Sequence, residues 1–423
     1  MKKATWQYFS LEEYSDRLSS LRKRMQEKQV DVMMIHTPEN LCYLTGYQTP
    51  GYYWYQTLIV PMDGEPVFIT RLIEATNIEP LTWVEDSRPY RDHENWVAHT
   101  IDALKSCGLE DKHIGLEYDS WFLTTRDYLQ LTSSLQDTKF VDCSGLVEEG
   151  RMIKSSQEIE YIRQAAKASE AGMRAGIEAT EIGCTENDVA AAIHSAQIKA
   201  GSEYTGLPIF IRSGARNALT HSTWYRKELV PNEGVSFEIP GCINRYHAAQ
   251  MTNIFLGDPP QAVVKGTEVM VQALDETMNF IKPGITTAHE AHMHCAKVID
   301  DGDLGVSMNH RAAYSIGIGF APDWGEGHII SMKEGEHTTL QTGMTFHLIP
   351  LVFLPGLTSV GTSHTIHITD NGCQPTSQRY MKACSDLKIT QIITNRNKNM
   401  VWSNYREKRF RMFMRKFRKI CIF

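Results

Sequence analysis

The stretch that decides the interpretation of this chain reads Val235-Ser236-Phe237-Glu238-Ile239-Pro240-Gly241-Cys242-Ile243-Asn244-Arg245-Tyr246-His247. Its first five residues predict an apolar strand, and a turn is expected after them. A carboxylate inside such a strand is costly unless it is paired or used, so Glu238 is either a structural ion-pair acid or a catalytic group. Arg245, Tyr246 and His247, just beyond the turn, are candidate partners for that carboxylate.

Helices interleaved with antiparallel-type strands surround this stretch. Ser155 to Glu158 and Thr185 to Asp188 both have the pattern of a helix-starting cap. The other expected elements are helices over 263–281 and from 287, and strands over 209–212, 344–350 and 365–369. Together they predict an α+β domain over residues 151–380.

The first 150 residues follow a different pattern. A helix and a short apolar strand are expected within 11–36. Alternating strands at 56–60 and 66–70 are joined by Asp63-Gly64, a typical hairpin turn. Residues 1–150 therefore predict a separate α/β domain, and the chain is expected to comprise two domains and an appendage.

Composition restricts the class of protein. The chain has 423 residues, of which 42% are hydrophobic, and its net charge of −7 disfavours nucleic-acid binding. Nine cysteines without a Cys-x-x-Cys pair indicate reduced thiols and no cysteine zinc site. No apolar run approaches the ~18 residues of a membrane span. The N-terminus lacks the apolar core of a signal peptide, so a cytoplasmic location is expected.

The end of the chain carries the opposite charge. Residues 406–419 contain eight Lys or Arg and one acid, interleaved with Phe410, Phe413, Met414 and Phe417. Such a segment suits a membrane surface or a partner groove. A solvated extension over 381–423 that contacts neither is nevertheless the expectation.

Three other segments carry side chains suited to chemistry. A Gly-containing loop ends in His221, and histidine is the natural proton carrier near neutral pH. Asp323, Trp324 and Glu326 lie close together in a loop, and their carboxylates and ring suit a small cationic or zwitterionic ligand. His347 alternates with apolar neighbours and is either a ligand-binding or a hydrogen-bonded core histidine.

Taken together, these segments resemble the creatinase/aminopeptidase P family, whose catalytic domain has the pita-bread fold. The resemblance spans roughly residues 10–372, and is carried by Tyr43-Leu44-Thr45-Gly46-Tyr47, Lys154-Ser155, the loop ending in His221, and Gly343-Met344-Thr345-Phe346. Within the metal-free branch of the family, the ectoine hydrolases are the most similar. That similarity rests on Phe237 to His247, Phe255-Leu256-Gly257-x-Pro259-Pro260 and Pro322-Asp323-Trp324-Gly325-Glu326.

Metal-dependent members of the family bind two metals through two Asp, one His and two Glu. The resemblance places those five positions at Ile239, Gln250, Ile316, Ile349 and Ser363. Isoleucine has no donor atom, and neither Gln nor Ser brings the negative charge that two cations need. We therefore expect no metal and no other cofactor, which argues against a dipeptidase.

The resemblance implies a homodimeric hydrolase that opens the cyclic amidine ring of ectoine to N-acetyl-diaminobutyrate. Glu238 is the expected nucleophile and His221 the expected proton shuttle. The residues expected to bind this small zwitterionic substrate are Arg245, Tyr246, His247, Asp323, Trp324, Glu326, His347 and, at the contact between subunits, Trp54. Two alternatives stay open: a creatinase-like or other small-amidine or zwitterion hydrolase or lyase, and a non-catalytic binding protein on the same fold.

Overall fold

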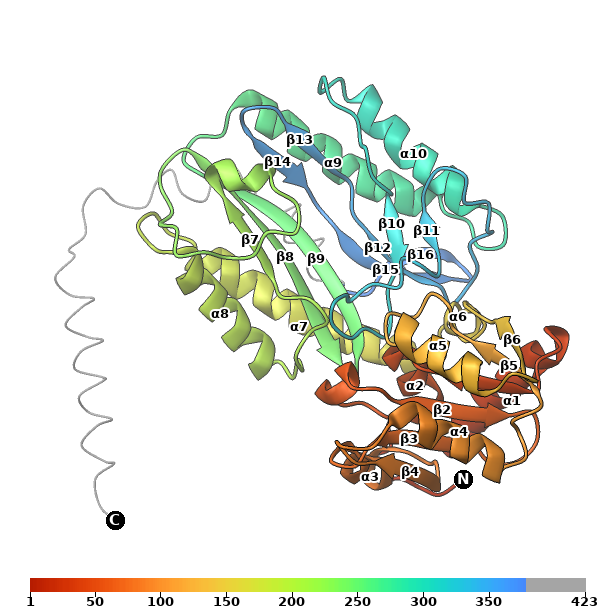
Figure 1. The fold of residues 1–423 in the computed structure, drawn as a ribbon. Coiled ribbons are helices and arrows are strands. Elements are labelled where there is room, and N and C mark those ends of the chain that lie inside the picture. The colour runs from red at the N-terminus through yellow and green to blue at the C-terminus, as the bar shows by residue number, and fades with distance from the viewer. Residues whose placement is uncertain (378–423) are drawn as a thin grey trace, which may run out of the picture.

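The computed structural model describes residues 1–377, which form two domains (Figure 1). Both domains combine helices with sheets, as the sequence predicts. The basic extension predicted over 381–423, and the last residues of the domain predicted over 151–380, lie outside the described residues.

The N-terminal domain is built on a six-stranded sheet in the order β4-β3-β2-β1-β5-β6. The predicted hairpin at Asp63-Gly64 is confirmed, because β2 and β3 pair antiparallel on either side of it. Strand β1 is antiparallel to β2 and parallel to β5, so the sheet is mixed. The elements are α1 (Leu11–Glu27), β1 (Val32–Ile35), α2 (Pro38–Thr45), η1 (Pro50–Tyr53), β2 (Thr57–Pro61), β3 (Val67–Arg71), η2 (Glu74–Asn77), α3 (Ile78–Leu81), β4 (Asp86–Tyr90), α4 (Trp96–Ser106), β5 (His113–Leu116), α5 (Thr125–Ser134), β6 (Lys139–Asp142) and α6 (Glu148–Arg151).

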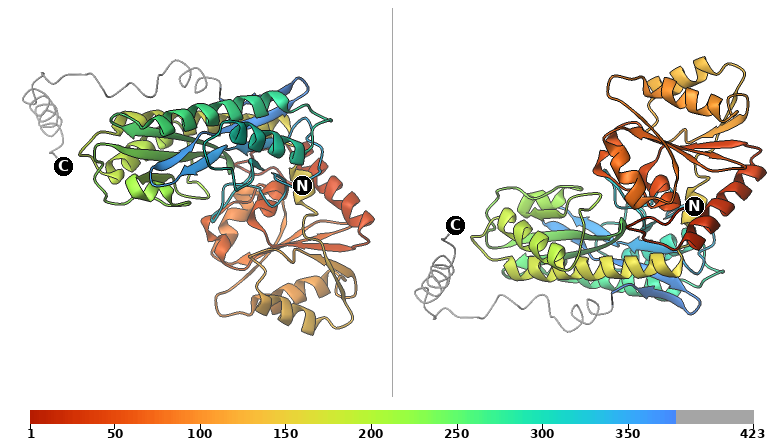
Figure 2. Two further views of the ribbon diagram at one scale, coloured as in Figure 1. Left: turned by 90° about the horizontal axis from the view of Figure 1, so that it is seen from above. Right: turned by 90° about the horizontal axis from the view of Figure 1, so that it is seen from below.

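The C-terminal domain contains two main sheets with helices on their outer faces (Figure 1 and Figure 2). The first has the order β7-β8-β9 and the second β11-β10-β12-β15-β16, with β13-β14 as a separate pair. Helix α7 packs against β8 and β9, whereas α9 and α10 pack against each other and cover the second sheet. The elements are α7 (Ser156–Ala179), α8 (Glu186–Lys199), β7 (Phe210–Ser213), η3 (Gly214–Ala218), β8 (Glu233–Ile243), β9 (Tyr246–Leu256), α9 (Gln261–Phe280), α10 (Ala288–Asp301), β10 (Ala313–Ser315), β11 (Ser331–Met332), β12 (Thr345–Leu348), β13 (Leu351–Leu354), β14 (Thr358–Gly361), β15 (His364–Thr369) and β16 (Gly372–Pro375).

Strand β8 is longer than the sequence predicts. It continues through Pro240-Gly241, and the turn falls at Asn244 and Arg245, whose φ angles of 49° and 67° are left-handed. Proline is tolerated because β7 pairs with β8 only as far as Glu238, so no partner on that side needs the missing N–H of Pro240. Glycine is required at 241, because a Cβ there would lie 2.0 Å from the carbonyl oxygen of Ala165.

The predicted starts of α7 and α8 are confirmed. Ser155 and Glu158 form a complete capping box at the start of α7, and Thr185 and Asp188 form another at α8. Each box satisfies backbone N–H groups that a helix start would otherwise leave without partners. These two helices thereby begin at fixed residues and hold the outer face of the first sheet.

A single apolar core crosses the junction between the domains. Phe9 and Tyr14 of the N-terminal domain pack with Tyr246, Ile318 and Phe320 of the C-terminal domain. Burial of such shared aromatic surface fixes the two domains against each other. A membrane-spanning helix is not found among residues 1–377, because none of their helices combines the length and the apolar composition that a bilayer requires.

Candidate active site

Strand register brings the carboxylate of Glu238 to the inner side of the first sheet. Phe210 of β7 is opposite Glu238 of β8, and Glu238 is opposite Met251 of β9. Cross-strand partners share a face of a sheet. Met251 packs against Tyr314 and Ile349, which belong to the second sheet and the loop after it. Glu238 therefore faces the space between the sheets and not the helices.

Burial perturbs this carboxylate strongly. Only 9% of Glu238 is exposed, and burial raises its pKa to about 7, with Arg212 acting in the opposite direction and Asp323 in the same direction. No hydrogen bond to its side chain is formed by any of residues 1–377. An acid that is half ionised near neutral pH, desolvated and without a partner is suited to nucleophilic or proton-transfer chemistry.

Arg212 is a site residue that the sequence reasoning missed. It lies two residues after Phe210 on β7, so it shares the inner face of the sheet. Its Nη1 donates to the carbonyl oxygen of Leu219 at 2.9 Å, but Nε and Nη2 are buried and have no partner within the described part of the chain. Its guanidinium can therefore bind a substrate carboxylate. Arg212 could have been recognised in the sequence as a cationic residue in an otherwise apolar strand.

A chain of hydrogen bonds lines the opposite wall. Trp324 Nε1 donates to Tyr314 Oη at 2.8 Å, and Tyr314 Oη lies 2.7 Å from Nδ1 of His347. His347 Nε2 is 2.5 Å from Oγ of Ser363. Burial lowers the pKa of His347 to about 3, so its imidazole stays neutral. Tyr314 thus joins the predicted residues Trp324 and His347, and Glu238 contributes to raising the pKa of the Tyr314 phenol.

Two further predicted residues lie at the rim. The ring of His221 is 5.6 Å from that of Phe210, which in turn is 5.4 Å from that of Trp324. His221 is exposed and has a left-handed φ of 49°. Asp323 accepts backbone N–H bonds from Trp324 and Gly325, which fixes the loop that presents the indole. Both His221 and Asp323 are thus exposed to solvent at the edge of the aromatic cluster formed by Phe210 and Trp324.

Arg245, Tyr246 and His247 are engaged elsewhere. Arg245 donates to the carbonyl oxygens of Tyr204 and Gly319, both at 2.7 Å. The Tyr246 hydroxyl donates to Glu158 at 2.8 Å in the core of the domain junction. The Nε2 of His247 accepts from a backbone N–H at 3.0 Å, and its Nδ1 is 2.9 Å from a carbonyl oxygen. The structure thus gives these side chains roles in bracing loops, and does not bring Arg245 and Tyr246 to Glu238.

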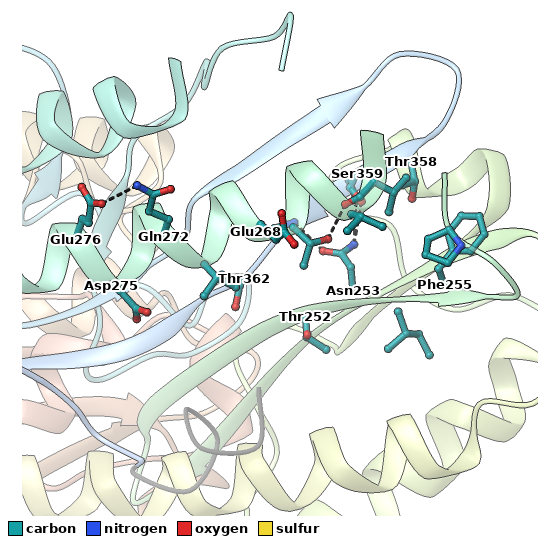
Figure 3. Close-up of a pocket in the computed structure, with 17 residues that line it drawn as sticks. Thr252, Asn253, Phe255, Glu268, Gln272, Asp275, Glu276, Thr358, Ser359 and Thr362 are labelled. Carbon is teal, nitrogen blue, oxygen red and sulfur yellow. Dashed lines mark hydrogen bonds between the residues drawn. The ribbon is translucent and has the colours of Figure 1, made fainter. Parts of the chain in front are cut away.

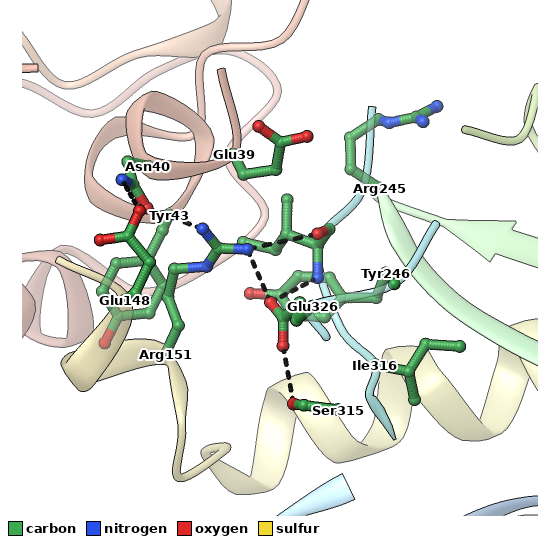
Figure 4. A network of polar contacts seen from close by, with 12 residues as sticks. Glu39, Asn40, Tyr43, Glu148, Arg151, Arg245, Tyr246, Ser315, Ile316 and Glu326 are labelled. Carbon is green, nitrogen blue, oxygen red and sulfur yellow. Dashed lines mark hydrogen bonds and ion pairs between the residues drawn. The ribbon is translucent and has the colours of Figure 1, made fainter. Parts of the chain in front are cut away.

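Glu326 lies in a buried ion-pair network at the domain junction (Figure 4). Its two oxygens pair with Arg151 at 2.8 Å and with Lys154 at 2.6 Å, and all three side chains are 1% exposed. Burial alone would raise the pKa of Glu326, but Lys154 and Arg151 lower it to about 2. The Arg151 guanidinium also donates to Asn40 of the N-terminal domain. The structure therefore gives Glu326 cationic partners of its own in place of a substrate.

Trp54 lies on the surface of the N-terminal domain. It is 36% exposed, and the guanidinium of Arg71 stacks 4.3 Å from its ring. Its neighbour Tyr52 is the residue that reaches the catalytic domain, donating to the carbonyl oxygen of Ala321 at 3.0 Å. Within one chain, Trp54 is not brought to Glu238.

Two of the five positions that the resemblance gives to metal ligands, Ile239 and Gln250, face away from the space between the sheets. Ile239 packs against Met173 of α7, and Gln250, its cross-strand partner, shares that outer face. Successive residues of a strand point to opposite faces. The positions that face the space between the sheets are therefore Glu238 and Met251.

Neither set of positions fits a pair of metal ions. With Ile316, Ile349 and Ser363, the inward-facing Glu238 and Met251 provide one carboxylate, one thioether and one hydroxyl, and the outward-facing Ile239 and Gln250 provide no charge at all. Divalent cations of such sites require several carboxylate or imidazole ligands. Among residues 1–377, no group of three or more His, Cys, Asp or Glu could hold a metal ion. The dinuclear centre of the metal-dependent relatives thus has no ligand set in the described chain.

A cavity of about 670 Å³ lies between β9, α9 and β14 (Figure 3). Residues such as Thr252, Phe255, Glu268 and Asp275 line it. None of the predicted site residues does. Volume alone therefore does not locate the chemistry of this molecule.

Known families match both domains. The model of metallopeptidase family M24 matches residues 160–370, and that of the creatinase/prolidase N-terminal domain matches residues 17–153. The two matches fall on either side of the junction between α6 and α7.

Individual proteins give the same picture. The ectoine hydrolase of Halomonas elongata is 32% identical over 386 residues, which cover 86% of this chain and 95% of that protein. An uncharacterized hydrolase/peptidase of Sinorhizobium fredii is 30% identical over 381 residues, 87% of this chain and 96% of that one. The solved prolidases of Pyrococcus horikoshii and Thermococcus sibiricus are similar with TM-scores of 0.75 and 0.77 at 20% identity, over 86% of this chain and 98% and 97% of theirs. These likenesses confirm a creatinase-type N-terminal domain followed by a pita-bread domain.

Proposed function

This chain belongs to metallopeptidase family M24, and from that premise we propose that it hydrolyses the cyclic amidine ring of ectoine, without a metal, to N-acetyl-diaminobutyrate. The observation that carries the proposal is Glu238, a buried carboxylate with a pKa of about 7 and no protein partner in the described chain. It supplies the nucleophile that a metal-bound water supplies in other hydrolases.

The surroundings of Glu238 match the parts of such a substrate. Ectoine combines a flat, cationic amidine with a carboxylate. Trp324 and Phe210 present aromatic surface to the amidine, and the carboxylates of Glu238 and Asp323 attract its charge. The free Nε and Nη2 of Arg212 are suited to the substrate carboxylate. We therefore assign that role to Arg212 in place of Arg245.

The reaction needs one water molecule and no other co-reactant. Glu238 attacks the amidine carbon, and a ring C–N bond breaks as the departing nitrogen takes a proton. Water then attacks the same carbon and releases the Glu238 carboxylate together with the new amide. In net balance the departing nitrogen gains two protons, equal in number to those of the water, and leaves as an ammonium group. His221, at the rim, exchanges protons with solvent.

Incubation with ectoine and analysis of the products tests the proposal. We expect N-acetyl-diaminobutyrate from the wild-type protein and a loss of at least ~10³-fold in kcat for Glu238→Gln. Creatine and Xaa-Pro dipeptides in parallel assays separate the alternatives, since the absence of a metal ligand set predicts no dipeptidase activity. Binding of ectoine without product would instead support a non-catalytic binding protein, and full activity of Glu238→Gln would contradict the mechanism.

The homodimer implied by the resemblance belongs to the same proposal. Tyr53 and Trp54 are the exposed aromatic residues that we assign to the subunit contact. Size-exclusion chromatography with light scattering should give twice the mass of one chain. A Trp54→Ala variant should shift that mass towards the monomer, and an unshifted dimer would remove Trp54 from the contact.

A further inference from the structure

The Trp324–Tyr314–His347–Ser363 chain of hydrogen bonds has a direction. The indole Nε1 of Trp324 can only donate, so Tyr314 Oη accepts from it at 2.8 Å. Neutral imidazole has one donor and one acceptor nitrogen. The two remaining contacts, at 2.7 and 2.5 Å, can therefore be arranged in only two ways.

In the first arrangement, Tyr314 donates to Nδ1 of His347, and Nε2–H of His347 donates to Ser363. The hydroxyl proton of Ser363 is then left over. Ser363 is fully buried, and its Oγ has no other hydrogen-bond partner among the described residues. A buried donor without an acceptor destabilises the structure, because it has lost its hydrogen bonds to water.

In the second arrangement, Ser363 donates to Nε2 of His347, and Nδ1–H of His347 donates to Tyr314. The proton left over is now that of the Tyr314 hydroxyl. Tyr314 packs against Met251, the cross-strand partner of Glu238, so the phenol borders the space that Glu238 faces. The proton left over there can be donated to a bound substrate, whereas that of Ser363 has no acceptor among the described residues, and the second arrangement is therefore favoured.

We propose that Tyr314 is a further catalytic residue, which donates its hydroxyl proton to the departing nitrogen while His347 and Ser363 hold it in the donating orientation. This inference rests on the proposed function. In this arrangement two N–H groups, from Trp324 and His347, donate to the phenolic oxygen and stabilise the charge that develops there. The histidine and the serine are positioning residues, since neither gives up a proton to substrate.

The proton balance closes within the reaction. As the ring C–N bond breaks, the proton of Tyr314 moves to nitrogen, and the phenolate keeps the electron pair of the O–H bond. The water that attacks the Glu238 adduct returns one proton to Tyr314 and passes the other to the product amine. Tyr314 therefore ends each turnover protonated, and burial keeps its pKa well above the usual value, so the acid form is present at neutral pH.

The tautomer of His347 tests the arrangement without any substrate. In ¹⁵N-histidine-labelled protein near pH 7, we expect the His347 signals of a neutral ring with the proton on Nδ1. His347→Gln identifies the signals by their loss. In Ser363→Ala we expect the proton of the neutral His347 ring to move to Nε2. In Ser363→Thr we expect it to return to Nδ1. A wild-type ring protonated on Nε2 would overturn the inference.

Kinetics test the role of the phenol. Tyr314→Phe should lower kcat on ectoine by ~10²–10⁴-fold with little change in KM, whereas Tyr118→Phe, a matched loss of an exposed hydroxyl in the N-terminal domain, should not. Ser363→Ala should lower kcat by about tenfold, and Ser363→Thr should rescue it. If the wild-type protein turns over ectoine and Tyr314→Phe keeps its kcat, Tyr314 is not the acid although the proposed function stands. If the wild-type protein is inactive, the proposed function fails and the catalytic role of Tyr314 fails with it; the spectrum then tests only the orientation of the chain.

Discussion

Replacing Glu326 by Gln tests whether this residue supports the domain junction or binds substrate. The substitution keeps the size of the side chain but removes the carboxylate charge that pairs with both buried cations, Arg151 and Lys154. Removing one member of a buried ion pair typically costs about 3–5 kcal/mol. The lowering of the Glu326 pKa from 4.5 to about 2 gives an independent figure of about 3 kcal/mol. At roughly 2–4 °C per kcal/mol, the expected fall in Tm is ~10 °C.

The pH dependence of this destabilisation follows from the direction in which the pKa of Glu326 is shifted. The folded-state pKa of Glu326 is depressed, so its contribution is fully present above the unfolded value and is lost as the pH falls from about 4.5 towards 2. Thermal unfolding of both proteins between pH 2 and 8 should show a Tm difference that is constant above pH ~5 and shrinks below it. Glu334→Gln, which alters an exposed carboxylate, is the matched control. An unchanged Tm with a raised KM for ectoine would refute this reasoning and return Glu326 to the substrate site.

Three other predictions concern the site. Because Glu238 must be ionised to attack, kcat/KM for ectoine should rise with pH through a midpoint near 7, and an activity that is flat from pH 5 to 8 would contradict that role. Arg212→Met should raise KM for ectoine by about 10–100-fold. It should also move the acidic limb of the kcat/KM profile to higher pH, because Arg212 lowers the pKa of Glu238. Arg174→Met, which removes an exposed arginine, should do neither. Dialysis against a chelator should leave kcat unchanged, since the five family positions offer no ligand set; activity lost to the chelator and restored by Zn²⁺ or Mn²⁺ would show a metal site elsewhere.

Local patterns of the sequence were sufficient to predict several features. Glu238 stands out because an apolar strand surrounds it, and the helix starts at Ser155 and Thr185 are recognisable because all atoms of a cap come from four consecutive residues. The hairpin at Asp63-Gly64 is equally local. Each of these depends on residues that are close together in the chain.

Features that depend on distant residues were harder to predict. Glu326 has the same loop context as Asp323, and only the fold reveals that Arg151 and Lys154 reach it. The sequence also does not show that Arg245 is fully engaged by backbone carbonyls while Arg212 is not.

The metal positions on β8 and β9 show a different limit. The resemblance gives these positions to Ile239 and Gln250, which are cross-strand partners on the outer face of the sheet. The face that each residue takes depends on how β8 pairs with β9 around the turn at Asn244 and Arg245, and that turn lies four residues later than the sequence pattern suggests.

Trapping the enzyme during turnover tests the central claim most directly. The full chain is mixed with excess ectoine, quenched in acid within the first turnovers, digested and analysed by mass spectrometry. The mechanism predicts a substrate-derived adduct on the peptide that contains Glu238, absent from Glu238→Gln and from samples quenched after the substrate is exhausted. Product formation without any adduct on that peptide, in a wild-type protein shown to be turning over when quenched, would contradict a covalent role for Glu238.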